Sequence, residues 1–185
     1  MSTGAFWVIA DVCLLYFFGW SGVLAHLPVY STSVGLSEHA AANALAGIAI
    51  LCVFGVLAFG VSVDRWNQQR VAAVGLIFFA AGTAMLLATE WLNGPLLILS
   101  LILIGLPSGG LDIVWASLLR AKFGTQHFGA IFSAWYLVVL IILVVGPIAD
   151  VAHSFATAWL GIAVAMVSSS LLIGGVRLRN RSQVA

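Results

Sequence analysis

The sequence predicts an all-α integral membrane protein built as one bundle of six transmembrane helices. Its mean hydropathy is +1.16. Only 7% of its residues are charged, whereas about a quarter are charged in an ordinary soluble domain. Six long apolar stretches follow one another, and the basic residues occur only in alternate gaps between them. A soluble fold is therefore excluded, and the lipid bilayer is the first expected partner.

The six apolar stretches define the predicted spans. Each has about 20 residues or more, which is the length that an α-helix needs to cross about 30 Å of hydrocarbon. The gaps between them are too short for a soluble domain, so we expect a single domain over residues 1–185. The predicted spans are about residues 6–29, 39–62, 70–89, 94–118, 127–149 and 155–176.

The positions of the basic residues predict the orientation. Lys and Arg are absent from the first, third and fifth gaps. Because cytoplasmic loops of membrane proteins are enriched in Lys and Arg, we expect both termini in the cytoplasm, in a bacterial plasma (inner) membrane. The seven basic residues are Arg65 and Arg70 in the second gap, Arg120 and Lys122 in the fourth, and Arg177, Arg179 and Arg181 in the tail.

No cofactor, metal or nucleic acid is expected. Cys13 and Cys52 lie inside predicted spans and lack the spacing of a multi-ligand metal site. No basic stripe suggests nucleic acid. A membrane enzyme is the least favoured class, because no Ser-His or H-E-x-x-H arrangement occurs at usable spacing and no phosphate-binding glycine loop is present.

The second gap contains the most specific motif. Residues 60–70 read Gly-Val-Ser-Val-Asp-Arg-Trp-Asn-Gln-Gln-Arg, and we call this segment the signature loop. It resembles the signature loop of the major facilitator superfamily, G-x-x-x-D-R-x-G-x-x-R, which joins the second and third helices of a six-helix half. The resemblance implies that Gly60, Asp64, Arg65 and Arg70 take part in the conformational change of a transporter.

The residues of the signature loop have physical roles that the sequence suggests. Gly60 would let neighbouring helices approach closely, and Asp64 would pair with a basic group or accept from a helix N-terminus. Asn67 stands where the family usually has a second glycine. We expect it in a left-handed turn, since Asn tolerates that conformation better than most residues.

Other segments resemble the C-terminal half of facilitators related to monocarboxylate and oxalate–formate transporters. The resemblance implies secondary transport of a small solute. Two features of that subgroup are missing: Val56 follows Gly55 where an intramembrane Arg is common, and stretch 127–149 contains no Lys. Substrate chemistry is therefore not inherited. The segments are 6–7, 26–30, 35–37, 40–42, 123–124, 128–129 and 146–150.

Two carboxylates lie inside predicted spans, where an ionisable group is costly and usually functional. Asp11 lies about 8 Å into the first helix, and Asp112 lies about 12 Å from the basic end of the fourth. Helical spacing places each carboxylate on a face with small or polar residues. These faces are Asp11, Leu15, Gly19, Gly22 and His26 on the first helix, and Leu101, Gly105, Ser108 and Asp112 on the fourth. The resemblance puts both faces in the central cavity.

The function of these carboxylates has two readings. In the first, Asp11 or Asp112 binds a proton or a cationic group during transport, with Ser108 and His26 in the same site. In the second, Asp112 pairs with Arg65 or Arg120, and Asp11 reaches water near its helix end.

Six helices are half of a major facilitator, whose two bundles rock about a central site. We therefore expect a second bundle as partner, supplied by a second copy or by another chain. The alternative is a truncated or non-transporting protein that acts in membrane interaction or assembly.

Overall fold

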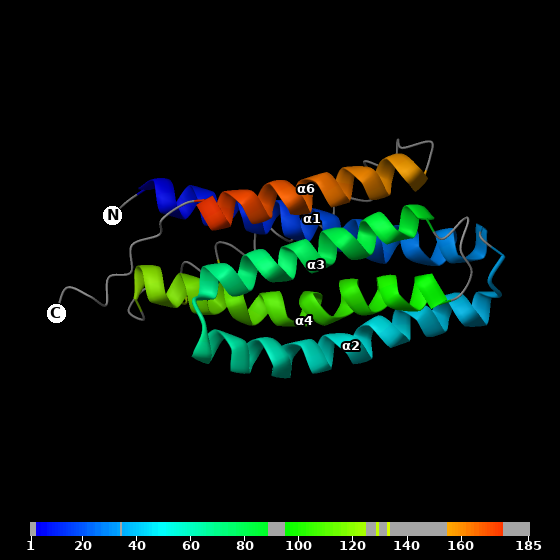
Figure 1. Cartoon of the computed structure of the whole chain (residues 1–185), viewed down its shortest axis with the longest axis horizontal. Helices are drawn as coiled ribbons and strands as arrows, with labels where there is room; N and C mark the ends of the chain where they lie inside the picture. Colours follow the sequence, from blue (N-terminus) through cyan, green and yellow to red (C-terminus); the bar gives the residue numbers. More distant parts are fainter. Residues whose placement is uncertain are drawn as a thin grey trace.

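The computed structural model describes residues 3–33, 35–88, 95–124, 129, 133 and 155–175. All the regular secondary structure in these residues is α-helical (Figure 1). The predicted span 127–149 and the basic tail from Arg177 lie outside the described residues, apart from Gly129 and Ser133. The helices are α1 Thr3–Ser33, α2 Glu38–Arg65, α3 Gln68–Ala88, α4 Pro95–Phe123 and α6 Phe155–Gly175.

Within the described residues, four of these helices are long and apolar enough to cross a membrane. They contain the spans Trp7–Ser33, Glu38–Arg65, Gln68–Leu87 and Leu96–Lys122, and Trp159–Gly175 forms a shorter apolar helix. The all-α membrane class predicted from hydropathy is confirmed, and four of the six predicted spans correspond to these long apolar helices.

Several helices continue beyond the predicted spans, because hydropathy marks only the apolar part of a helix. At the end of α1, the hydroxyl of Thr32 donates to the carbonyl of Val29 at 2.9 Å, and that of Ser33 to Tyr30 at 2.7 Å. These bonds let polar residues stay helical. α2 begins after Ser37, whose hydroxyl accepts from the Ala40 amide at 3.2 Å as an N-cap.

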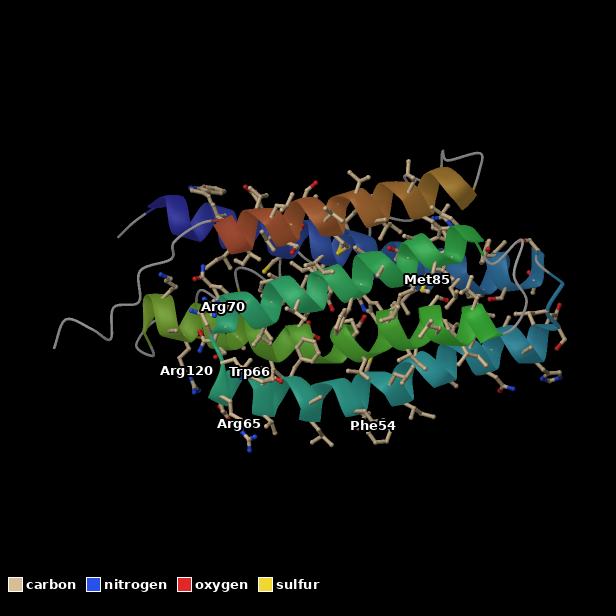
Figure 2. All side chains as sticks on the ribbon, viewed as in Figure 1. Phe54, Arg65, Trp66, Arg70, Met85 and Arg120 are labelled. Atoms are coloured by element: carbon tan, nitrogen blue, oxygen red, sulfur yellow. The ribbon has the colours of Figure 1, made fainter. Side chains whose placement is uncertain are left out.

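The helices run up and down in one bundle. Figure 1 shows α3 between α6 and α4, with α2 beside α4 at the edge, and the helix contacts agree. This alternation places the end of α2, the start of α3 and the end of α4 together. Arg65, Arg70 and Arg120 consequently lie at one end of the bundle (Figure 2), which we call the loop end.

The interior is filled by large side chains from α1, α3, α4 and α6. Tyr16, Phe79, Trp115 and Trp159 are among the largest fully buried residues. The outer surface is also apolar, as expected where lipid is the solvent. α2 exposes the most, including Phe54, which points away from the bundle in Figure 2.

α2 and α4 touch through their backbones, and glycine makes the contact possible. A Cβ on Gly55 would collide with the carbonyl of Leu106, and a Cβ on Gly109 would collide with the carbonyl of Cys52. Small residues of this kind let membrane helices approach closely. The close approach expected at Gly60 is wrong, since a Cβ there would meet only the side chain of Ile113 at 4.0 Å.

We predict that Gly55→Ala lowers the free energy of unfolding in detergent by about 1–3 kcal/mol, the usual cost of overpacking. The added methyl group has no space against α4. Gly47 lies in the same helix with nothing within 4 Å of its Cβ position. Gly47→Ala is therefore the matched control and should not lower stability. Because Ala has a higher helix propensity than Gly, propensity cannot cause a loss. Equal loss in both variants would therefore contradict the assignment of the effect to the α2 and α4 contact.

Candidate functional site

A buried tyrosine joins the middle of α1 to the middle of α4. The Tyr16 hydroxyl donates to the carbonyl oxygen of Ser108 at 2.8 Å. Its ring contacts Phe79 of α3 and Trp115 of α4, with ring centroids 6.0 and 6.1 Å apart. A phenol in hydrocarbon needs an internal partner. The hydrogen bond thus fixes the register of α1 against α4.

This register places the two intramembrane carboxylates at similar depth. Asp11 precedes Tyr16 by five residues on α1, and Asp112 follows Ser108 by four residues on α4. At helical rise these offsets are about 7.5 and 6 Å, both toward the loop end because the helices are antiparallel. Both side chains are exposed on the bundle surface.

Asp112 lies in a small polar cluster where α1, α2 and α4 meet. It is close enough to the Tyr16 hydroxyl and the Cys52 thiol to interact electrostatically with both. Within the described part of the chain, Asp112 forms neither a hydrogen bond nor an ion pair. The alternative reading, an ion pair with Arg65 or Arg120, is therefore absent from this structure.

The expected open face of α1 is instead largely a packing face. A Cβ on Gly19 would meet the Met166 side chain at 2.5 Å, and one on Gly22 would meet Ile162 at 3.0 Å. His26 contacts the Trp159 ring edge-on at 6.3 Å. All three partners belong to α6. The prediction that this face lines a cavity as a whole is wrong, and only its Asp11 end is exposed.

The expected face of α4 is divided in the same way. Leu101, Gly105 and Ser108 are buried, whereas Asp112 is exposed. A Cβ on Gly105 would meet Leu51 of α2 at 2.9 Å. The Ser108 hydroxyl donates to the carbonyl of Ile104 in the previous turn, so its role in the cluster is to present its own carbonyl to Tyr16.

The signature loop is held by residues other than its charged ones. Asp64, Arg65 and Arg70 are exposed, and no ion pair joins any two of them in the described residues. Gln68 donates through Nε2 to the Ser117 hydroxyl of α4 at 2.7 Å, and Gln69 donates to the carbonyl of Ile173 of α6 at 3.4 Å. These amides tie the start of α3 to two neighbouring helices.

Asn67 is an N-cap residue rather than a left-handed turn. Its Oδ1 accepts from the Gln69 amide at 2.9 Å, and its carbonyl accepts from Val71 at 3.0 Å. Among the described residues, only glycines have positive φ. The left-handed prediction is wrong because Trp66 is extended, with φ −123° and ψ 166°, and α3 begins directly afterwards.

Sequence reasoning did not single out three polar residues that tie the bundle together, Tyr16, Gln68 and Gln69. The role of Tyr16 could have been predicted from the sequence, because a phenol in the middle of an apolar span must find a hydrogen-bond partner. The roles of Gln68 and Gln69 could not, because both occupy variable positions of the motif. No group of His, Cys, Asp or Glu that could hold a metal occurs where the structure describes the chain.

Comparison with known proteins extends over almost the whole chain. The family model described as Major Facilitator Superfamily matches residues 4–183. Monocarboxylate transporter 12 of Mus musculus is 28% identical over 183 residues, and that of Rattus norvegicus is 27% identical over 183 residues. Each alignment covers 95% of this chain but 38% of the relative. The chain thus spans less than half the length of these relatives.

We predict that Asn67→Ala destabilises the start of α3 by about 1 kcal/mol, because the Gln69 amide loses its capping acceptor. Hydrogen exchange at the Gln69 and Arg70 amides should be faster by about fivefold. Asn67→Ser keeps a capping oxygen and should exchange as the natural protein does. Unchanged exchange in the alanine variant would argue that Gln68 and Gln69 alone hold this end.

Proposed function

Since its match to the family model covers residues 4–183, the chain belongs to the major facilitator superfamily, and we propose that it transports a small solute as a six-helix half-transporter. The family match places it among membrane transporters rather than enzymes. The observation that carries the proposal within this family is the Tyr16 link. It supports a similar depth for the carboxylates Asp11 and Asp112 on α1 and α4.

Six crossings are supported by where the described helices begin and end. α4 ends at the loop end, and α6 starts at the opposite end of the bundle (Figure 1). The chain between Phe123 and Phe155 must connect the two ends, and it contains the apolar stretch 127–149. One further transmembrane helix in this stretch is the simplest connection.

In the proposed orientation, the loop end and both termini lie in the cytoplasm. The clustering of Arg65, Arg70 and Arg120 at that end supports it (Figure 2). Labelling of an Ala121→Cys variant by an impermeant thiol reagent, added outside intact cells, would contradict it. The assignment to a bacterial inner membrane stays a prediction.

Proton coupling is the proposed role of Asp11 and Asp112. A charged carboxylate inside a span costs free energy, and binding a proton or a cationic substrate group would neutralise that charge. Asp112 is the stronger candidate, because it interacts electrostatically with Tyr16 and Cys52 and no basic partner neutralises it among the described residues. In this proposal Ser108 positions Tyr16, and His26 supports the α1 and α6 contact.

The relatives are named monocarboxylate transporters, but we do not propose a monocarboxylate as the substrate of this chain on that basis. The arginine that commonly follows Gly55 in that subgroup is Val56 here, and its side chain is 41% exposed. This position supplies no cation for an anionic substrate.

A second six-helix bundle is the proposed partner. α2 exposes large apolar side chains along its length, with Ile50, Phe54 and Leu57 each about 60% exposed. Such a face suits either lipid or another bundle. The second candidate function is membrane interaction or assembly without transport. The same exposed face of α2 favours it, but it gives Asp11 and Asp112 no role.

We predict that Asp112→Asn abolishes the dependence of uptake on external pH, because an amide carries no proton. Uptake into proteoliposomes would be measured with radiolabelled solutes, beginning with monocarboxylates. Asp11→Asn should weaken the dependence. Glu38→Gln serves as the control, because it removes an exposed carboxylate at the start of α2, at the end of the bundle away from the loop end. Unchanged pH dependence in both Asp variants would remove the carboxylates as proton carriers.

We predict that the protein purified in mild detergent has the mass of a pair of bundles, either two copies or this chain with a second six-helix protein. Native mass spectrometry distinguishes the two. A stable monomer that still binds other membrane proteins through α2 would contradict the transporter proposal and favour the assembly role.

A further inference from the structure

A groove separates α2 from α3 at the loop end. α2 packs on α4 through Gly55, which draws it away from α3. The extended backbone at Trp66 then carries the chain across to α3. The remaining space has a volume of about 410 Å³. The groove exists because consecutive helices pack on a common neighbour rather than on each other.

The inner part of this groove is apolar. Its walls are formed by Phe59 of α2 and by Val71, Val74 and Phe78 of α3. Phe59 is buried, and its ring lies against the backbone of Gly110 on α4. Val74 and Phe78 are nearly half exposed, at 48% and 45%. A surface of this kind, in a membrane-spanning helix, faces hydrocarbon chains.

The mouth of the groove is polar and basic. Ser62, Trp66, Asn67 and Arg70 line it, and Figure 2 shows Trp66 and Arg70 together at the loop end. Trp is enriched where a membrane meets water. Arg70 is exposed and has no acidic partner in the described residues. The groove therefore pairs an apolar interior with one cation at headgroup level.

We propose that this groove binds an anionic phospholipid, with an acyl chain along Val74 and Phe78 and its phosphate against Arg70. Basic pockets between transmembrane helices are suited to anionic headgroups. The guanidinium also presents several donors to a phosphate in a fixed geometry. The site is separate from the two carboxylates, so the proposal does not depend on transport.

A lipid fits this groove better than a second protein does. The apolar part lies between Val71 and Phe78, about 10 Å along α3. A packed bundle would need a longer apolar stripe, and the exposed side chains Ile50, Phe54 and Leu57 of α2 lie outside the groove. The cation at the mouth also complements a phosphate.

The headgroup contact is tested by native mass spectrometry of the full chain in mixed micelles of phosphatidylglycerol and phosphatidylcholine. The natural protein should retain phosphatidylglycerol preferentially. Arg70→Gln should lower that preference about fivefold. Arg65→Gln makes the same change of charge in the same loop, but Arg65 does not line the groove. It should retain the preference. Arg70→Lys keeps the charge but not the guanidinium geometry, so it should lower the preference less than Arg70→Gln does.

The acyl-chain contact is tested by filling the groove. Val74→Phe should reduce the retention of both lipids, whereas Val61→Phe, at an exposed α2 position outside the groove, should not. Equal losses in the Arg65 and Arg70 variants would overturn the proposal in favour of diffuse surface charge. Unchanged retention in Val74→Phe, or displacement of lipid by a co-purified protein, would overturn it as well.

Discussion

The backbone contact between α2 and α4 is the interaction on which the arrangement of the bundle depends. Gly55 and Gly109 remove the two Cβ atoms that would keep the helices apart. In hydrocarbon no hydrophobic effect drives helices together, so close packing of this kind supplies much of the attraction. With α2 held on one side of α4 and α3 on the other, the groove between α2 and α3 follows directly.

The second constraint is that polar groups in a bilayer must find partners inside the protein. Thr83 and Ser100 donate to carbonyls in the preceding turn of their own helices. Tyr16, Tyr30 and Ser170 donate across helices to the carbonyls of Ser108, Leu86 and Ala73. Three buried groups of the described residues also lack a hydrogen-bond partner, Ser31 Oγ and the indole nitrogens of Trp115 and Trp159. These groups are neutral, whereas Asp112 is a carboxylate with neither a hydrogen bond nor an ion pair in the described residues. That contrast is the structural reason for assigning it a functional role.

The loop end combines three features in a short distance. It contains the basic residues on which the proposed orientation rests, the amides of Gln68 and Gln69 that fasten α3, and the mouth of the α2 and α3 groove. A lipid bound at Arg70 would contact the same loop whose motif marks the superfamily. Membrane composition and the conformation of the signature loop would then be physically linked, since both act on the start of α3.

Hydropathy and charge by themselves determined the all-α membrane class and four of the spans, and the signature loop determined the family. These signals are local, because the bilayer imposes one length and one composition on each crossing helix. Side-chain partners required the tertiary structure. Gly60 belongs to the motif and Asn67 replaces its second glycine, yet the close approach occurs at Gly55, and Asn67 caps α3. Helical periodicity likewise placed Asp11 with Gly19 and His26, but α6 covers only the latter two. One helix face can be shared by several neighbours, and only packing decides which residues each neighbour covers.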